Sequence, residues 1–186
     1  MKEYDIGSSA ARIAFLAAAT SLLAACTILQ ESGPQAEAKL EPRSDSSVSG
    51  MVRFLAAGQK VRVEASVAGL TPGEHGFHVH EAGDCSAPDA ASAKGHFNPA
   101  AKPHGHHGDA ERHAGDMPNL VADANGRATL LAELDMLQLR EGPNGILQRS
   151  VVIHADRDDY ASQPAGNSGK RVACGVIRAV APGNAY

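Results

Sequence analysis

The chain has 186 residues, of which 43% are hydrophobic and 20% are charged, enough to build the core of about one domain. Its 17 Lys and Arg residues against 21 Asp and Glu give a net charge of −4. This balance argues against a strongly basic nucleic-acid-binding protein, and the apolar content argues against wholesale disorder. Histidine is the unusual residue, because eight of the nine histidines lie between His75 and His113.

The N-terminal segment resembles an export signal. Arg12 precedes an apolar run over residues 13–25, which suits the core of a secretion signal and is too short to span a membrane as a helix. The run ends LAAC at Cys26, which resembles the lipobox of bacterial lipoproteins, in which the cysteine is lipidated and becomes the first residue after cleavage. The alternative is an ordinary signal peptide with an incidental cysteine. We therefore expect residues 1–25 to be a lipoprotein signal peptide.

The segment after the lipobox is polar. Residues 31–47 are rich in Pro, Ser and Glu and lack hydrophobic periodicity, so their composition indicates a flexible tether. We assign residues 26–35 to the lipidated cysteine and its tether. We expect a lipid-anchored protein of the periplasm and cell envelope, and Thr27 after the lipidated cysteine is typical of Gram-negative lipoproteins sorted to the outer membrane.

Short strand-like runs follow from Val48 onward, with apolar residues at period two and Gly, Pro, Asn or Asp between the runs. They are VSGMVRFL (48–55), KVRVEASVAG (60–69), HGFHVH (75–80), SVVIHA (150–155) and RVACGVIRAV (171–180). This pattern predicts an all-β fold, an antiparallel β-sandwich or barrel. The one stretch with a helical pattern covers residues 128–139.

The strand pattern stops between His80 and Asp116, and a loop that long inside a compact domain is usually functional or disordered. His78 and His80 are two residues apart, so on a strand both imidazoles face one side and can bind one metal, whereas His75 faces the other way. The pair alone fits a polar, solvated strand face equally well.

The long loop adds a second group of ligand-type side chains, His96, His104, His113 and Asp116. Three imidazoles and one carboxylate complete a tetrahedral zinc site. A closed shell of four protein ligands is typical of a structural zinc site.

Two cysteines remain besides Cys26. Export would place them in a compartment that permits disulfides, so we expect Cys85 and Cys174 to be bonded to each other. The alternative is two free, buried thiols. The bond would close a loop of 89 residues and restrict the unfolded chain by about 4 to 5 kcal/mol on the loop-entropy account.

Six segments together resemble the copper/zinc superoxide dismutase family. They are GEHGFHVHEAGDC (73–85), GHFNP (95–99), HG (104–105), ERHAGDMPNL (111–120), VVIHADRDDY (151–160) and GKRVACGVI (169–177). The resemblance runs from about residue 36 to residue 181. It implies a Greek-key, immunoglobulin-like β-sandwich or barrel with long metal-binding loops, a dismutase domain over 36–186, and a first strand at 36–42.

The resemblance also implies the metal ligands. The implied copper ligands are His78, His80, His96 and His154, and the implied zinc ligands are His96, His104, His113 and Asp116. His96 would serve both metals, which requires both ring nitrogens to be deprotonated, and two nearby dications make that form accessible. His154, alone in an apolar strand, would otherwise be interpreted as a core histidine.

Further roles follow from the same resemblance. Arg171 matches the arginine beside the copper, where a guanidinium attracts and orients the superoxide anion. Asp158 matches the carboxylate that joins a copper histidine, here His78, to a zinc histidine, here His104. Cys85 and Cys174 match the disulfide of the family.

Three histidines have no ligand role in this scheme. We expect His75 to make a structural hydrogen bond behind the site, and His106 and His107 to be solvated loop residues. Asp159, next to Asp158, has no expected role in the site.

The implied activity is dismutation of superoxide to dioxygen and hydrogen peroxide by copper redox cycling, which would protect the cell envelope from oxidative damage. Zinc would hold His96, which would release copper on reduction, take a proton and pass it to the departing peroxide. The expected partners are the superoxide anion and, through the lipid, a membrane. We expect no nucleic-acid partner and a monomer or homodimer.

The segment between Asp158 and Arg171 has only 12 residues and lacks the paired glutamates of the corresponding loop in the eukaryotic enzymes. Lys170 adds a positive charge beside Arg171, which favours the approach of anions. The main alternative is a non-catalytic copper- and zinc-binding envelope lipoprotein, which would have no use for Arg171 beside copper. A zinc hydrolase would need an open position on zinc, and the four-ligand set leaves none.

Overall fold

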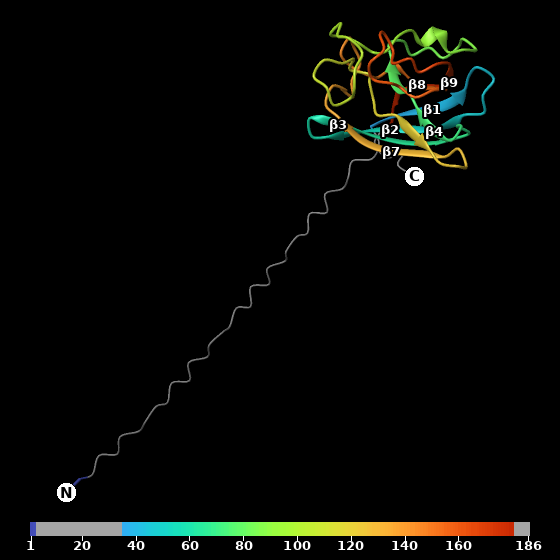
Figure 1. Ribbon diagram of the computed structural model, residues 1–186. Helices are drawn as coiled ribbons and strands as arrows, with labels where there is room; N and C mark the ends of the chain where they lie inside the picture. Colours follow the sequence, from blue (N-terminus) through green and yellow to red (C-terminus); the bar gives the residue numbers. More distant parts are fainter. Residues whose placement is uncertain (3–34, 181–186) are drawn as a thin grey trace. The chain divides into compact units, whose positions relative to one another are not determined.

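The computed structural model describes residues 35–180, together with the first two residues (Figure 1). The segments predicted to be the signal peptide (1–25) and the lipidated Cys26 with its tether (26–35) lie outside the described residues, apart from residues 1, 2 and 35. Within the described part of the chain, no helix is both long and apolar enough to cross a membrane.

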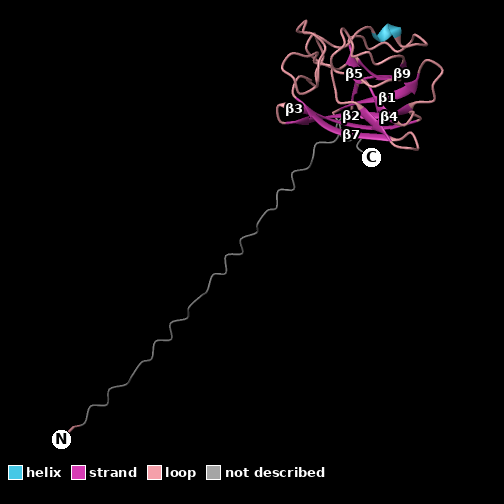
Figure 2. Cartoon of the chain, in the orientation of Figure 1, coloured by secondary structure: helices cyan, strands magenta, loops and turns pink. Residues whose placement is uncertain are grey.

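The described residues form ten strands and one 3₁₀ helix, so the secondary structure is almost entirely β (Figure 2). In chain order, the elements are β1 (Ala36–Pro42), β2 (Ser49–Ala57), β3 (Lys60–Ala68), β4 (Gly73–His75), β5 (Phe77–His80), η1 (Ala91–Ala93), β6 (Leu120–Ala122), β7 (Ala128–Leu134), β8 (Ser150–His154), β9 (Arg171–Val176) and β10 (Arg178–Ala179).

Eight of these strands form one curled antiparallel sheet in the order β5-β8-β9-β1-β2-β3-β7, with β10 beside β1, and β4 and β6 form a separate pair. The sheet bends at β1. Glu41 and Pro42 pair with β9, whereas residues 36–40 pair with β2. The first strand, β1, pairs with the last two, β9 and β10, so the two ends of the described domain lie side by side, as in a Greek key. The all-β prediction is confirmed.

Alternating side chains of the strands build the core, as the period-two pattern predicts. On β3, Val61, Val63, Ala65 and Val67 are buried and their neighbours are half-buried or exposed. Removing each Val side chain from water stabilises the fold by about 1.5 to 3 kcal/mol.

Two interpretations, one from composition and one from a helical pattern, were wrong. Residues 36–42, which composition assigned to a tether, form β1, because its buried face (Ala36, Ala38 and Leu40) packs in the core and its backbone pairs on both sides. Residues 128–134, which showed a helical pattern, form β7 instead, paired with β3 over its whole length. The edge of β3 offers β7 a complete set of hydrogen bonds, which outweighs the local helical pattern.

The long loop after β5 folds back against β5 itself. The amide of Val79 donates to the carbonyl of Gly115 (2.9 Å), and the amide of Phe97 donates to the carbonyl of Val79 (2.8 Å). Gly115 lies so close to the strand that a Cβ there would be 2.2 Å from the carbonyl oxygen of Val79. Glycine is therefore required for the loop to dock, and docking brings the histidines of the loop to those of β5.

Candidate metal centre

Strand geometry places the first two histidines of the site. His78 and His80 alternate along β5 with Phe77 and Val79, and all four residues are buried. The apolar pair enters the core, while the histidine pair faces the loops. β8 pairs antiparallel with β5 and ends at His154, whose amide donates to the carbonyl of Gly76 just before β5, which brings this third histidine to the same edge of the sheet.

Four imidazoles meet at this end, and their ligand atoms all lie within 4.8 Å of one another. Each presents one buried ring nitrogen that has no hydrogen-bond partner, namely His78 Nδ1, His80 Nε2, His96 Nε2 and His154 Nε2. Buried polar atoms without partners are rare because each costs about 1 to 3 kcal/mol. Four unpartnered imidazole nitrogens around one point fit a copper ion.

The protein uses the other ring nitrogen to orient three of these imidazoles. His80 Nδ1 lies 2.9 Å from the carbonyl oxygen of Lys94, and His154 Nδ1 lies 3.3 Å from that of Gly169. His78 Nε2 lies 2.8 Å from a carboxylate oxygen of Asp158. An N–H donated to these oxygens leaves the inward nitrogen deprotonated, which is the form that binds a metal.

The second cluster gathers around one carboxylate oxygen. Asp116 Oδ1 lies 2.9 Å from His96 Nδ1, 3.1 Å from His104 Nδ1 and 3.3 Å from His113 Nδ1. Tetrahedral zinc with Zn–N bonds of about 2.0 to 2.1 Å separates neighbouring ligand atoms by about 3.3 Å. Asp116 Oδ2 accepts hydrogen bonds from the amides of Gly105 and His113. These contacts leave Oδ1 for a metal, and the donor set fits zinc.

His96 belongs to both clusters. Its Nε2 is one of the four unpartnered nitrogens of the first cluster, and its Nδ1 faces Asp116 in the second. The ring stacks on His78 with centroids 3.9 Å apart. The arrangement allows one imidazolate to bridge two metals.

Asp158 joins the two clusters from behind. Its two carboxylate oxygens lie 2.8 Å from His78 Nε2 and 2.8 Å from His104 Nε2, and all three side chains are fully buried. Asn119 holds the backbone of Asp158 at both its N–H and its carbonyl. Gly166 packs against the carboxylate so closely that a Cβ there would be 1.8 Å from Oδ1.

Sequence reasoning missed Asn119 and Gly166. Asn119 lies within the ERHAGDMPNL motif, which was the available signal for it. Nothing in the local sequence distinguishes Gly166 from the chain's other loop glycines.

Burial controls the protonation of the first cluster. It lowers the pKa of His80 and of His154 well below the ordinary value, and burial together with the neighbouring His78 lowers the pKa of His96 to about 4. Burial also lowers the pKa of His78, although Asp158 opposes the shift. These imidazoles are neutral at pH 7 and ready to bind a metal.

The second cluster behaves differently because it contains carboxylates. Burial acts to lower the pKa of His104, but hydrogen bonds to Asp116 and Asp158 prevail and raise it to about 9. Burial likewise opposes ionisation of Asp116, yet its contacts with His104, His113 and His96 hold its pKa well below the usual range. Without metal, His104 is therefore protonated at pH 7, and zinc binding would displace that proton.

Arg171 lies at the rim of the first cluster, at the start of β9. Its two terminal guanidinium nitrogens donate to the carbonyls of Ala90 and Lys94, each at 2.7 Å. The carbonyl of Lys94 also faces His80 Nδ1, so one backbone oxygen connects the arginine to a cluster histidine. A hollow of about 600 Å³ reaches Arg171 and His154 from the surface, and it offers a small anion a path to both.

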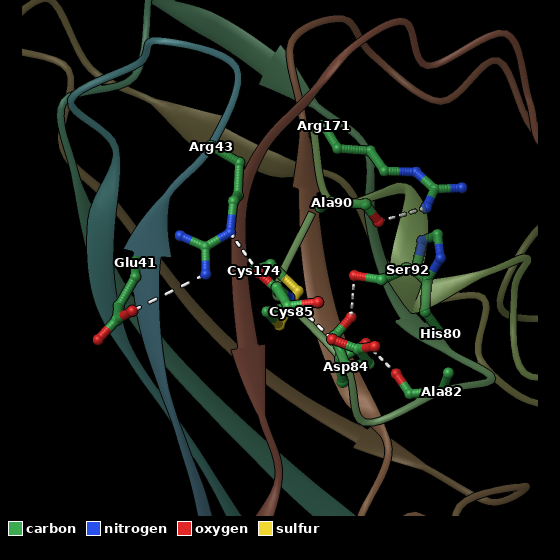
Figure 3. Close-up of a disulfide and its surroundings, with 12 residues drawn as sticks. Glu41, Arg43, His80, Ala82, Asp84, Cys85, Ala90, Ser92, Arg171 and Cys174 are labelled. Carbon is green, nitrogen blue, oxygen red and sulfur yellow. Dashed lines mark hydrogen bonds and ion pairs between the residues drawn. A yellow bond between two sulfur atoms is a disulfide. The ribbon is translucent and has the colours of Figure 1, made fainter. Parts of the chain in front are cut away.

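The predicted disulfide is confirmed. Cys85 and Cys174 are bonded, with an S–S distance of 2.02 Å, and the bond ties the long loop to β9 close to Arg171 (Figure 3). Cys174 is buried, and Cys85 is partly exposed.

The remaining histidines lie outside both clusters. His75 Nδ1 is 2.9 Å from the carbonyl oxygen of His154, and its Nε2 is 2.8 Å from that of Thr71, which is the structural role expected. His106 and His107 are half-exposed, with ring centroids 3.9 Å apart. Asp159 is half-exposed, and its carboxylate accepts hydrogen bonds from backbone amides of its own loop.

Known proteins share this combination of fold and clusters. A family model described as copper/zinc superoxide dismutase matches residues 48–177. A copper-zinc superoxide dismutase of Aquifex aeolicus is 41% identical over 140 residues, covering 73% of this chain and 82% of that protein. One from Deinococcus radiodurans is 39% identical over 170 residues, covering 85% and 91%.

A solved structure, described as that of the clock protein EA4, superposes with a TM-score of 0.71 at 41% identity, covering 79% of this chain and 96% of that one. The match to the family model spans most of the domain and includes every residue of both histidine clusters. The chain therefore belongs to the copper/zinc superoxide dismutase family.

Proposed function

We propose that this chain catalyses the dismutation of superoxide to dioxygen and hydrogen peroxide at the first histidine cluster. One observation carries the proposal: four buried imidazole nitrogens without partners converge beside an open hollow that His154 and Arg171 both line. His78, His80, His96 and His154 would hold copper. His96, His104, His113 and Asp116 would hold zinc.

Bound copper would supply a one-electron couple, oxidising one superoxide to dioxygen and reducing a second to the peroxide level. The zinc cluster would keep His96 in place and hold the long loop, because zinc does not change its oxidation state. The protein itself supplies the position and the electric field, and it passes on protons that come from water.

Arg171 attracts the substrate. Its guanidinium is fixed by two backbone carbonyls, so its charge stays at the copper side of the hollow, where a small anion is drawn in and oriented. Lys170, exposed beside it, adds to the positive field.

His96 carries a proton for the product. Its Nδ1 faces Asp116 and would bind zinc together with that carboxylate, while its Nε2 faces the first cluster without a partner in the protein. A proton taken up at Nε2 would therefore lie beside a species bound in that cluster, which favours its transfer to the departing peroxide.

We further propose that the enzyme is exported, lipidated at Cys26 and anchored in the cell envelope, with the outer membrane as its destination, where it removes superoxide. The lipobox-like LAAC supports this location, and the Cys85–Cys174 bond suits an oxidising compartment. A relative named extracellular superoxide dismutase, from Onchocerca volvulus, is 42% identical over 146 residues. Labelling with radioactive palmitate in a Gram-negative host tests the anchor, and Cys26→Ser should abolish the label.

The alternative is a lipoprotein that binds both metals without turnover. Residues 27–186 loaded with copper and zinc should dismute superoxide rapidly, and a zinc-only sample should not. Stoichiometric binding of both metals without turnover would establish the non-catalytic alternative.

A further inference from the structure

Arg43 reaches the disulfide loop from the turn that follows β1. Its Nε donates to the carbonyl of Cys85 (2.8 Å), and Nη1 donates to the carbonyl of Pro42 (2.6 Å). Figure 3 shows Nε of Arg43 turned toward the carbonyl of Cys85, next to the Cys85–Cys174 bond, and a terminal guanidinium nitrogen turned toward Glu41, whose carboxylate lies 3.8 Å from Nη2. Only 18% of the Arg43 side chain is exposed, and the hydrogen bond to Cys85 is charge-assisted and therefore among the stronger kinds.

The same turn also forms hydrogen bonds to β9, the strand that carries Arg171. The amide of Arg43 donates to the carbonyl of Val172 (2.9 Å), and the hydroxyl of Ser46 donates to the same oxygen (2.5 Å). On its other side, the amide of Ser44 donates to the carbonyl of Pro88 in the disulfide loop (2.8 Å). The turn therefore bridges the residue after Arg171 and the loop opposite it.

That loop supplies the two carbonyls that orient Arg171, those of Ala90 and Lys94. Hydrogen bonds within the loop connect the two parts: the hydroxyl of Ser92 donates to the carbonyl of Asp84 and accepts from the amide of Ala87. The amide of Ala90 donates to the carbonyl of Ala87, and the amide of Lys94 to that of Ala91. A shift of the backbone at Cys85 is therefore passed along a compact segment to both acceptors of Arg171.

The turn is held in an unusual backbone conformation. Ser44 (φ 52°) and Asp45 (φ 58°) are consecutive non-glycine residues with positive φ. Such conformations cost free energy and persist where surrounding contacts enforce them. The contacts of Arg43, Ser44 and Ser46 are the ones that enforce this turn.

We infer that Arg43 is a positioning residue for the anion site: it fixes the loop at Cys85 and so sets the acceptors that orient Arg171. The inference rests on the proposed function, in which Arg171 binds the anion. Arg43 touches neither the substrate nor any cluster histidine in the described contacts, so its effect passes through Arg171.

The test uses azide, a small anion that binds oxidised copper, with the copper- and zinc-loaded protein. Arg43→Gln should raise the azide dissociation constant about threefold to tenfold and leave the copper spectrum without azide unchanged. In the metal-free protein, Arg43→Gln should also speed amide hydrogen exchange at residues 85–94. Arg53→Gln is the matched control, because Arg53 is exposed on β2 and the charge change is the same.

A double-mutant cycle separates this inference from the function beneath it. Arg171→Gln alone should weaken azide binding, and adding Arg43→Gln to it should cause no further loss. If Arg171→Gln has no effect, the proposed anion site itself fails. If Arg171→Gln weakens azide binding but Arg43→Gln binds azide as tightly as Arg53→Gln, the positioning role is overturned. It is also overturned if Arg43→Gln weakens azide binding further in a protein that already carries Arg171→Gln.

A lysine variant covers the case in which Arg43→Gln does not fold. Arg43→Lys keeps the charge and one donor for the carbonyl of Cys85, so azide affinity should fall between that of the wild type and that of Arg171→Gln. Suppose that Arg43→Gln is unfolded and that Arg43→Lys shows wild-type azide affinity and wild-type hydrogen exchange at residues 85–94. This result would assign Arg43 to stability alone and overturn the inference.

Discussion

Single residues of the candidate metal centre divide their polar atoms between the protein and the metals. Three of the histidines use one ring nitrogen to contact an acceptor in the protein and direct the other toward the centre of the cluster, namely His78, His80 and His154. Among these acceptors, Asp158 contacts both clusters, because its carboxylate lies against one histidine from each. Changes at such acceptors should loosen metals without removing a ligand.

Asp158→Ala should therefore lower copper and zinc affinity by about 10- to 100-fold, the usual effect of losing a partner that orients metal ligands. Competition with a chelator measures both affinities. Asp159→Ala is the control, since Asp159 lies one residue away and contacts only its own loop. Equal affinities in the two variants would contradict the bridging role of Asp158.

Arg171→Ala should lower kcat/KM for superoxide about tenfold and flatten its decrease with added salt, because a fixed charge at the mouth of the site is lost. Copper content should stay at the wild-type level, since Arg171 is outside both clusters. Stopped-flow or pulse-radiolysis kinetics over a range of ionic strength test this. Unchanged kinetics at full copper occupancy would exclude the guidance role.

At the scale of elements, the site is a joint between β5, the end of β8 and the long loop. The loop contributes four of the seven cluster residues, and it reaches β5 through hydrogen bonds around Val79. The close approach at Gly115 is the most demanding contact of this joint.

Gly115→Ala should destabilise the protein by about 1 to 3 kcal/mol, the usual cost of overpacking, because the new Cβ meets a backbone carbonyl that cannot move aside. Zinc affinity should fall as well, since His113 and Asp116 are displaced. Urea unfolding and zinc titration measure the two effects. Gly95→Ala is a suitable control because a Cβ there meets nothing within 4 Å, and equal stabilities would refute the docking argument.

For the whole molecule, the disulfide and the buried histidines set stability. The Cys85–Cys174 bond spans 89 residues, so replacing both cysteines by serine should lower the free energy of unfolding by up to about 4 to 5 kcal/mol. Urea denaturation of the metal-free protein measures this loss. A change under about 1 kcal/mol would mean that the unfolded chain is already compact in this region.

The metal-free protein should be most stable near pH 6.5. Below that value, the unfolded chain takes up protons at His80, His154 and His96, whereas the folded chain keeps them neutral, His96 down to about pH 4, so stability falls as the pH decreases. His104 acts in the opposite direction, because its pKa is raised to about 9 and its contribution is lost as the pH rises through that value.

Denaturation midpoints between pH 4 and pH 9 would test this profile. The copper- and zinc-loaded protein should show a flat profile over the middle of the range, because bound metals keep the histidines deprotonated. A metal-free protein whose stability is the same at pH 4.5 and pH 6.5 would contradict the burial of neutral histidines.

Local hydrophobic pattern and motif spacing were sufficient to predict much of the fold and of the candidate metal centre. Alternation placed His78 and His80 on one face of a strand, because side chains of a strand point to opposite faces in turn. The motifs identified the family, and the resemblance predicted both sets of candidate ligands and the role of Asp158. Cys85 and Cys174 were paired by elimination, since Cys26 had another assigned role.

Tertiary structure alone decided the features that depend on residues far apart in the chain. Residues 128–134 became a strand because β3 offered an open edge, and residues 36–42 became one because β9 and β2 flank them. Arg43 gained its contact with Cys85, 42 residues away, only when β1 and β9 met in the sheet. Local sequence determines which way a side chain faces along its own element, but strand pairing and loop docking determine what it faces.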